Sequence, residues 1–144
     1  FITRILREFK TSLERKLLIE RLFTKFVTSD EKDFSENFYL NLKQVEEISN
    51  MGHIIGGHGY KSLDLRFCEI SEIKREIFNS DKFISKFNSQ DKYYAYANGG
   101  FNDLSIEVLR NLNFKKAFTT NLEYECSQNL KRYVTKRIDP SKLQ

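Results

Sequence analysis

The first third of the chain carries apolar side chains at a spacing of three or four residues. This spacing predicts an amphipathic helix of about four turns, packed on a domain or, alternatively, lying on a membrane surface. The residues that form the apolar stripe are Leu13, Leu17, Leu18, Leu22, Phe23 and Phe26. Residues 28–35 (TSDEKDFS) are polar and predict a loop. Asn41 followed by Gln44 resembles a capping box, and Gly52 lies where a helix over 41–50 would stop.

From residue 41 onward, helical and strand-like patterns alternate. Ile54 and Ile55 precede two glycines, which is typical of a short buried strand that enters a tight turn. Helices are predicted over 71–87 and after a cap at Asn102 or Asp103. The remaining predicted strands are 93–97, 116–120 and 133–137. This order predicts an α/β fold with a parallel sheet, whose ligands bind at the carboxyl ends of the strands.

Composition narrows the class of protein. The chain has 144 residues, of which 40% are hydrophobic, so it can bury a core and fits one domain. The net charge is +4 with both signs interspersed, so we expect no nucleic-acid partner. No apolar run is long enough to span a membrane. Cys68 and Cys126 are the only cysteines and predict free thiols, which favours a cytoplasmic location.

The two histidines, His53 and His58, are the first candidates for site chemistry. An odd separation places them on opposite faces of a strand, and on a helix they diverge as well, so they do not share a metal ion. A metal site needs three or four converging ligands. From these residues alone, His58 is either a structural residue or a functional residue at a strand end.

The sequence around His58 resembles a known motif. Residues 52–60 (GHIIGGHGY) are similar to the Gly-His-x-Ile-Gly-x-His phrase of the polysaccharide deacetylase (NodB-homology) family. In that phrase a second histidine follows four residues later, and both bind a divalent metal, usually zinc. The resemblance implies that His58 is a metal ligand, with Ser62 at the position of the second ligand.

Three later phrases agree with this resemblance. Residues 94–102 (YAYANGGFN) are similar to Phe-Ala-Tyr-Pro-Tyr-Gly-x-x-Asn, which implies that Asn98 and Gly99 form the loop that holds substrate and oxyanion, with a backbone N–H as donor. Residues 109–120 resemble a helix-then-strand phrase that ends in Ala-Phe-Thr-Thr. Residues 137–139 (RID) resemble a late Pro-Arg-Ile-Asp segment.

The resemblance also implies an architecture. The family fold is a distorted (β/α) barrel of about seven strands, and this chain would be a partial barrel that lacks its first strands. Residues 41–144 would form the partial deacetylase domain, and residues 1–40 would be a helical segment similar to an insert that some members carry. An open sheet edge would remain, and this edge could accept a partner chain.

The resemblance leaves two functional hypotheses. In the first, the chain belongs to a metal-dependent hydrolase that cleaves the amide C–N bond of N-acetylated sugars. The family's Thr-Phe-Asp-Asp-Gly motif, which supplies the general base, is absent from the sequence, so the chain would be incomplete as an enzyme. Asp64 could turn inward to replace a carboxylate, although an exposed loop position is the commoner case. In the second, the chain is a non-catalytic remnant or a domain that binds carbohydrate or a partner.

Overall fold

The computed structural model describes residues 12–88, 90–121 and 127–138, with side chains from residue 16 onward. The chain divides into two compact units, residues 1–44 and residues 45–144. Each unit is described by itself. Among the described residues, no helix is both long enough and apolar enough to span a bilayer.

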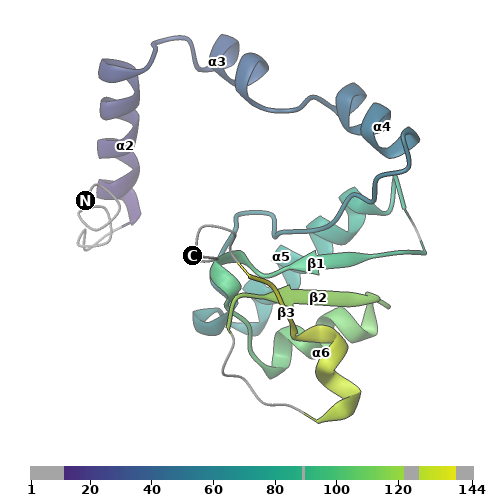
Figure 1. Cartoon of the computed structure of the whole chain (residues 1–144). Helices are drawn as coiled ribbons and strands as arrows, with labels where there is room; N and C mark the ends of the chain where they lie inside the picture. The colour runs from purple at the N-terminus through teal and green to yellow at the C-terminus, as the bar shows by residue number, and fades with distance from the viewer. Residues whose placement is uncertain (1–11, 89, 122–126, 139–144) are drawn as a thin grey trace. The chain divides into compact units, whose positions relative to one another are not determined.

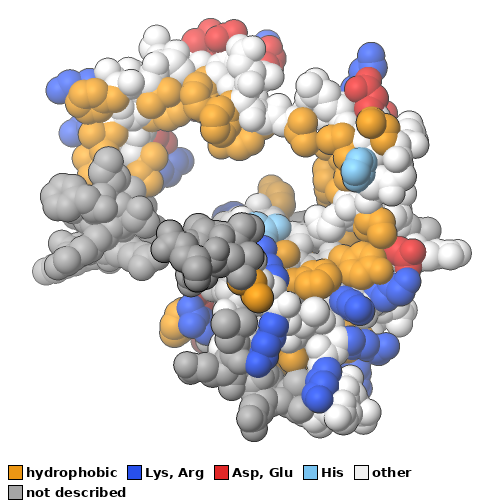
Figure 2. All heavy atoms as spheres, viewed as in Figure 1, with side chains coloured by type: hydrophobic (Ala, Val, Ile, Leu, Met, Phe, Trp, Pro, Cys, Tyr) orange, Lys and Arg blue, Asp and Glu red, His pale blue; other side chains and the backbone are white. Residues whose placement is uncertain are grey.

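The described part of the first unit contains two helices, α2 (Ser12–Phe26) and α3 (Glu31–Phe38). The loop predicted over 28–35 is therefore wrong in its second half. Asp30 caps α3, since its side chain accepts a hydrogen bond from the backbone N–H of Asp33 at 3.0 Å. Phe34 of α3 packs edge-on against Phe23 of α2, with ring centroids 5.1 Å apart, and this contact packs the two helices against each other. Figure 2 shows hydrophobic side chains along α2 and α3 that stay exposed in this unit.

Helix α4 (Leu42–Asn50) crosses the boundary between the units. The capping box predicted from the sequence is confirmed, because Asn41 and Gln44 exchange backbone-to-side-chain hydrogen bonds of 2.9 and 3.0 Å. Gly52 follows the helix with a positive φ of 92°, a conformation that glycine adopts without strain.

The second unit is built on three parallel strands in the order β1-β2-β3 (Figure 1). These are β1 (Tyr93–Ala95), β2 (Lys116–Thr119) and β3 (Thr135–Lys136), and each is shorter than the strand predicted from the sequence. The strand predicted at Ile54 and Ile55 is not formed. In its place a single parallel bridge joins Gly57 to Tyr94, and Ile54 is 51% exposed.

Two helices form the core with this sheet. Helix α5 (Ile70–Ile84) ends three residues before the predicted limit, and α6 (Asp103–Asn111) begins after its predicted cap, Asn102. Short 3-10 helices connect the elements: η1 (Leu65–Phe67), η2 (Ala97–Gly99) and η3 (Gln128–Tyr133). The buried cluster that joins the helices to the sheet comprises Leu65, Ile73, Ile77, Ile84, Tyr94, Tyr96, Phe101, Ile106, Val108, Leu109, Phe114, Ala117, Tyr133 and Val134.

The other face of the sheet is less covered. Side chains alternate along a strand, so Tyr93, Ala95 and Phe118 point away from the buried cluster that contains Tyr94 and Ala117. They are half-buried, and the rings of Tyr93 and Phe118 stack with centroids 6.3 Å apart. The α/β class with a parallel sheet is confirmed, although the described residues hold three strands and the sequence predicted four.

Candidate functional site at the carboxyl ends of the strands

His58 lies next to the carboxyl end of β1, directly after the residue that bridges to this strand. Its Nδ1 is 2.7 Å from the backbone carbonyl oxygen of Ala95. Because a carbonyl oxygen only accepts, Nδ1 is the donor of this hydrogen bond, which leaves Nε2 as the ring nitrogen that can bind a metal or accept a proton. A hydrogen bond of this kind is how proteins orient imidazoles that bind metals or accept protons. The close approach needs Gly57, since a Cβ there would lie 2.9 Å from the Tyr94 ring.

A buried carboxylate holds the turn that follows His58. Glu76 of α5 is 1% exposed, and its two carboxylate oxygens accept from the backbone N–H of Lys61 at 2.8 and 3.0 Å. Gly59 donates its N–H to Ser80 at 3.1 Å. Ser62, which the resemblance places at the second ligand position, is exposed in this turn with φ of 54°.

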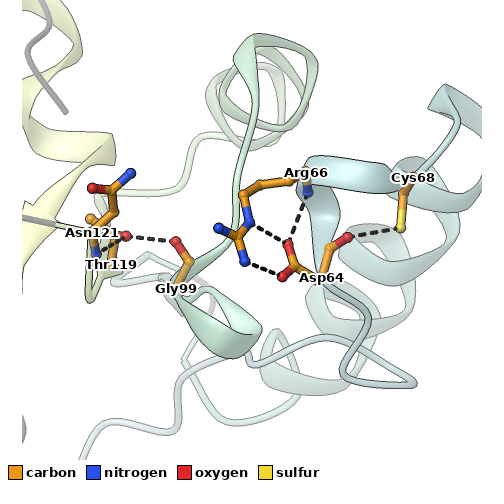
Figure 3. A network of polar contacts seen from close by, with 6 residues as sticks. All are labelled: Asp64, Arg66, Cys68, Gly99, Thr119 and Asn121. Atoms are coloured by element: carbon orange, nitrogen blue, oxygen red, sulfur yellow. Dashed lines mark hydrogen bonds and ion pairs between the residues drawn. The ribbon is translucent and has the colours of Figure 1, made fainter. Parts of the chain in front are cut away.

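Asp64 is engaged away from His58. Its carboxylate receives two hydrogen bonds from the Arg66 guanidinium, 3.0 Å from Nε and 2.6 Å from Nη2. This pairing holds the pKa of the Asp64 carboxyl below its usual value. Asp64 also caps η1 and its backbone oxygen accepts from the Cys68 thiol, as Figure 3 shows. The geometry therefore favours a structural role for Asp64 over the replacement of a missing carboxylate.

The loop after β1 contains two consecutive residues with positive φ. Asn98 is exposed with φ of 54°, and Gly99 is buried with φ of 70°. A Cβ on Gly99 would overlap the side chain of Thr120, so glycine is required there. The Thr119 hydroxyl donates to the Gly99 carbonyl at 2.7 Å and accepts the N–H of Asn121 at 2.9 Å (Figure 3).

Two backbone hydrogen bonds close this loop on itself. The N–H groups of Gly99 and Gly100 donate to the carbonyls of Tyr96 and Ala97, each at 3.0 Å. These bonds fix the backbone on either side of Asn98, whose side chain stays exposed at the carboxyl end of β1.

Arg137 lies on the other flank of β1. Its backbone N–H donates to the Thr119 carbonyl at 2.9 Å, which continues the pairing of β2 with β3. Its Nη2 donates to the Tyr96 carbonyl at 3.4 Å, so the side chain reaches back across β2. Arg137, His58 and Phe118 line one open cleft of about 390 Å³. Asp139, the last residue of the phrase that contains Arg137, lies outside the described residues, as does Cys126.

A second hollow, of about 410 Å³, lies beside α5. It shares His58 with the first and is otherwise lined by residues that include Phe83 and Lys86. His53 lines neither of the two clefts.

The donors present do not fit a complete metal site. Among residues 12–88, 90–121 and 127–138, no three His, Cys, Asp or Glu side chains come close enough together to hold a metal ion. A zinc site needs three or four protein ligands, and the chain brings one oriented imidazole, His58, to this place. Serine, at position 62, is a poor ligand for zinc compared with imidazole.

A parallel α/β fold with loops that converge at the carboxyl ends of its strands defines a class of ligand-binding and catalytic domains. Residues 22–117, more than half of the chain, match the sequence model of the polysaccharide deacetylase family. The chain belongs to this family. No curated protein matches the chain.

A solved structure agrees on the fold. The deacetylase PplD of Streptococcus pyogenes, in complex with acetate, superposes with a TM-score of 0.54 at 22% sequence identity. The match covers 72% of this chain and 49% of PplD, so the chain spans about half the length of that relative.

Two site residues were given no role by the sequence reasoning, Glu76 and Arg137. Glu76 could have been found, because it shares the apolar face of α5 with Ile73, Ile77 and Ile84. A carboxylate on such a face is seldom buried without a partner. Arg137 belongs to a recognised phrase, but its reach to Tyr96 joins residues far apart in the sequence.

Proposed function

We propose that this chain forms part of a carbohydrate deacetylase that hydrolyses the amide C–N bond of N-acetylated sugars, and that it does not complete the reaction alone. The observation that carries the proposal is the hydrogen bond between His58 and the Ala95 carbonyl. It aims one imidazole at the carboxyl end of β1, beside the loop of Asn98 and Gly99. Family membership supports the same reaction class.

The chain's own groups supply part of the required chemistry. When an acetamide carbonyl is attacked, its oxygen gains negative charge, and a fixed backbone N–H such as that of Asn98 stabilises that charge. The Thr119 hydroxyl and the tight turn at Gly99 hold this backbone in place before substrate arrives. The hydrogen bond from Nδ1 of His58 to the Ala95 carbonyl leaves Nε2 as the nitrogen for a ligand in the same region.

The described residues do not supply the remaining chemistry. The resemblance implies a divalent metal, zinc in most members, for which His58 would be one ligand. The general base of the family motif is absent from the sequence. The proposal therefore requires a carboxylate base and further ligands from outside the described part of this chain.

A second function is favoured by the substitutions around the site. Ser62, Ala97 and Asn98 each differ from the family phrases, and Asp64 is paired with Arg66. These differences fit a domain that binds carbohydrate or a partner chain without catalysis. The bridge residue Gly57 pairs on one side only among the described strands, so its outer edge is the place where a partner strand would add.

Zinc titration by calorimetry at neutral pH separates the two functions. The proteins are the chain, His58→Ala and the matched control His53→Ala, which removes a histidine that lines neither cleft. Because one ligand alone holds zinc weakly, the deacetylase proposal expects weak binding to the chain and to the control, and its loss in His58→Ala. Equal binding by all three proteins would leave the non-catalytic function as the better account.

Acetate release from chitotetraose tests the incompleteness of the site. The chain alone should release none. A longer protein that joins a family Thr-Phe-Asp-Asp-Gly strand to this chain should release acetate, and its His58→Ala variant should not. If the longer protein binds zinc but releases acetate neither from chitotetraose nor from soluble peptidoglycan fragments, deacetylation is refuted.

A further inference from the structure

The cleft beside β1 holds a cationic group that the proposed reaction does not use. Arg137 follows β3, where Thr135 pairs with Phe118 on β2. Side chains two residues apart share a face of a sheet, so Arg137 points to the same open face as Phe118 and Tyr93. It is exposed, and its long side chain extends toward β1 rather than into solvent.

His58 and Arg137 stand on opposite flanks of the end of β1. The N–H of Ala95 and the carbonyl that His58 contacts face the side of Gly57. The N–H of Tyr96 donates to Phe118 on the β2 side, and its carbonyl accepts from Arg137. A ligand seated at the end of β1 therefore lies between an imidazole and a guanidinium.

The charge of the cleft is one-sided. Its lining contains His58 and Arg137 and, in the described part of the chain, no carboxylate. The Tyr96 carbonyl, at 3.4 Å, is a long contact that uses one of the five N–H groups of the guanidinium. The remaining donors form a planar fork that matches a carboxylate or a phosphate.

The floor of the same cleft is aromatic. Tyr93 and Phe118 both line it, with their rings nearly parallel at an angle of 25°. Such a surface suits the flat apolar face of a sugar ring, and the guanidinium at its rim suits an acidic substituent on that ring.

We propose that Arg137 binds an oxyanion on the sugar, so that the cleft selects an N-acetylated sugar that carries a carboxylate over a neutral one. This inference rests on the proposed function, since it takes the ligand of the cleft to be an N-acetylated sugar. Arg137 determines specificity here, and the acetamide end of the sugar lies toward His58.

Matched monosaccharides test the inference by ¹H–¹⁵N NMR titration. N-acetylglucosamine, N-acetylmuramic acid and N-acetylglucosamine 6-phosphate share a ring and an acetamide and differ in charge. The expected result is that N-acetylmuramic acid binds the chain at least about tenfold more tightly than N-acetylglucosamine, as a charge-assisted bidentate contact allows. Tighter binding of the phosphate than of the carboxylate would overturn the choice of an acidic sugar in favour of a phosphosugar.

Variants assign the effect to Arg137. Arg137→Gln should reduce binding of N-acetylmuramic acid about tenfold and leave N-acetylglucosamine unchanged, and Arg137→Lys should lie between because it keeps the charge but loses the fork. The control Lys116→Gln also removes one positive charge from the open face of the sheet, but at the amino end of β2. It should leave the affinity for all three sugars unchanged.

The titrations distinguish a failure of this inference from a failure of the proposed function. Equal binding of the neutral and acidic sugars, unchanged in Arg137→Gln, would overturn this inference and leave the proposed function standing. If Arg137→Gln and Lys116→Gln lose the same affinity for N-acetylmuramic acid, the preference is a general electrostatic attraction and the inference is overturned. Binding of none of the three sugars to the chain would overturn both.

Discussion

Gly100 offers a sharp test of how the site loop is supported. It follows η2 with φ of −82°, an ordinary backbone conformation. Glycine is required at this position because a side chain would clash with its neighbours, and not because the backbone is strained. A Cβ there would overlap the Asp64 carboxylate and lie 3.0 Å from the Arg66 Nε. Gly100→Ala must displace the ion pair or the loop, and we expect about 1–3 kcal/mol of lost stability, as for other overpacked sites.

A double-mutant cycle checks the cause. Asp64→Ala alone should cost about 1 kcal/mol, because the ion pair is partly exposed, at 20% for Asp64 and 50% for Arg66. In the double variant the methyl group that Gly100→Ala introduces finds room where the carboxylate was. The double variant should therefore be more stable than the sum of the two single effects predicts, by about 1–2 kcal/mol.

Urea unfolding followed by the near-ultraviolet tyrosine signal is the assay. This signal reports on the second unit, where Tyr94, Tyr96 and Tyr133 are buried. Gly56→Ala is the control, because its Cβ would meet nothing closer than 3.4 Å, and it should be near neutral. If Gly100→Ala is as stable as Gly56→Ala, or if the cycle is additive, the steric reasoning is refuted.

The same variants predict a pH dependence. Arg66 lowers the pKa of Asp64 in the folded chain, so the stabilisation is present above the unfolded pKa of an aspartate. It is lost as the pH falls through the folded pKa. The stability difference between the chain and Asp64→Ala should therefore shrink on acidification and stay constant around neutral pH; a difference that grows toward acid would contradict the pairing.

Three further predictions concern the turn, the loop and the thiol. Glu76→Ala should destabilise by about 2 kcal/mol and accelerate amide hydrogen exchange at Lys61, whereas Glu76→Gln, which keeps an acceptor, should do less; equal exchange in both would refute the role of the carboxylate. Thr119→Val should lose about 1–3 kcal/mol in urea unfolding because the buried Gly99 carbonyl loses its donor, and Thr119→Ser should stay near the parent. Burial raises the pKa of the Cys68 thiol, so iodoacetamide should label it more slowly than a free cysteine at neutral pH, as peptide mapping would show.

The sequence predicted helix starts well where the capping residue bonds to a residue three positions away. The Asn41–Gln44 box and the Asn102 cap both appear as expected, with bonds between residues three apart. Helix α3 was missed because its residues are mostly polar. Its signal was the cap at Asp30 together with Phe34 and Phe38 four residues apart, whose rings stack at 5.1 Å.

The site was predictable in its position and not in its connections. The glycines after β1 lie at a strand end, as expected. His58 was expected at the end of its own strand, which is not formed, and it lies instead beside the carboxyl end of β1. The partners of each side chain were not readable, because Ala95 is 37 residues from His58 and Tyr96 is 41 residues from Arg137. The strand at Ile54 and Ile55 was overpredicted, since apolar character alone cannot tell whether a neighbouring strand exists on both sides.

The short parallel sheet also bears on how the chain folds. Its pairings join Tyr93 to Lys116 and Phe118 to Thr135, so each contact closes a stretch of about twenty residues. Parallel strands need a crossover of a dozen or more residues, so these closures are short ones for this topology. Strand, helix and strand emerge from a ribosome in immediate succession, and the second unit can begin to assemble during synthesis.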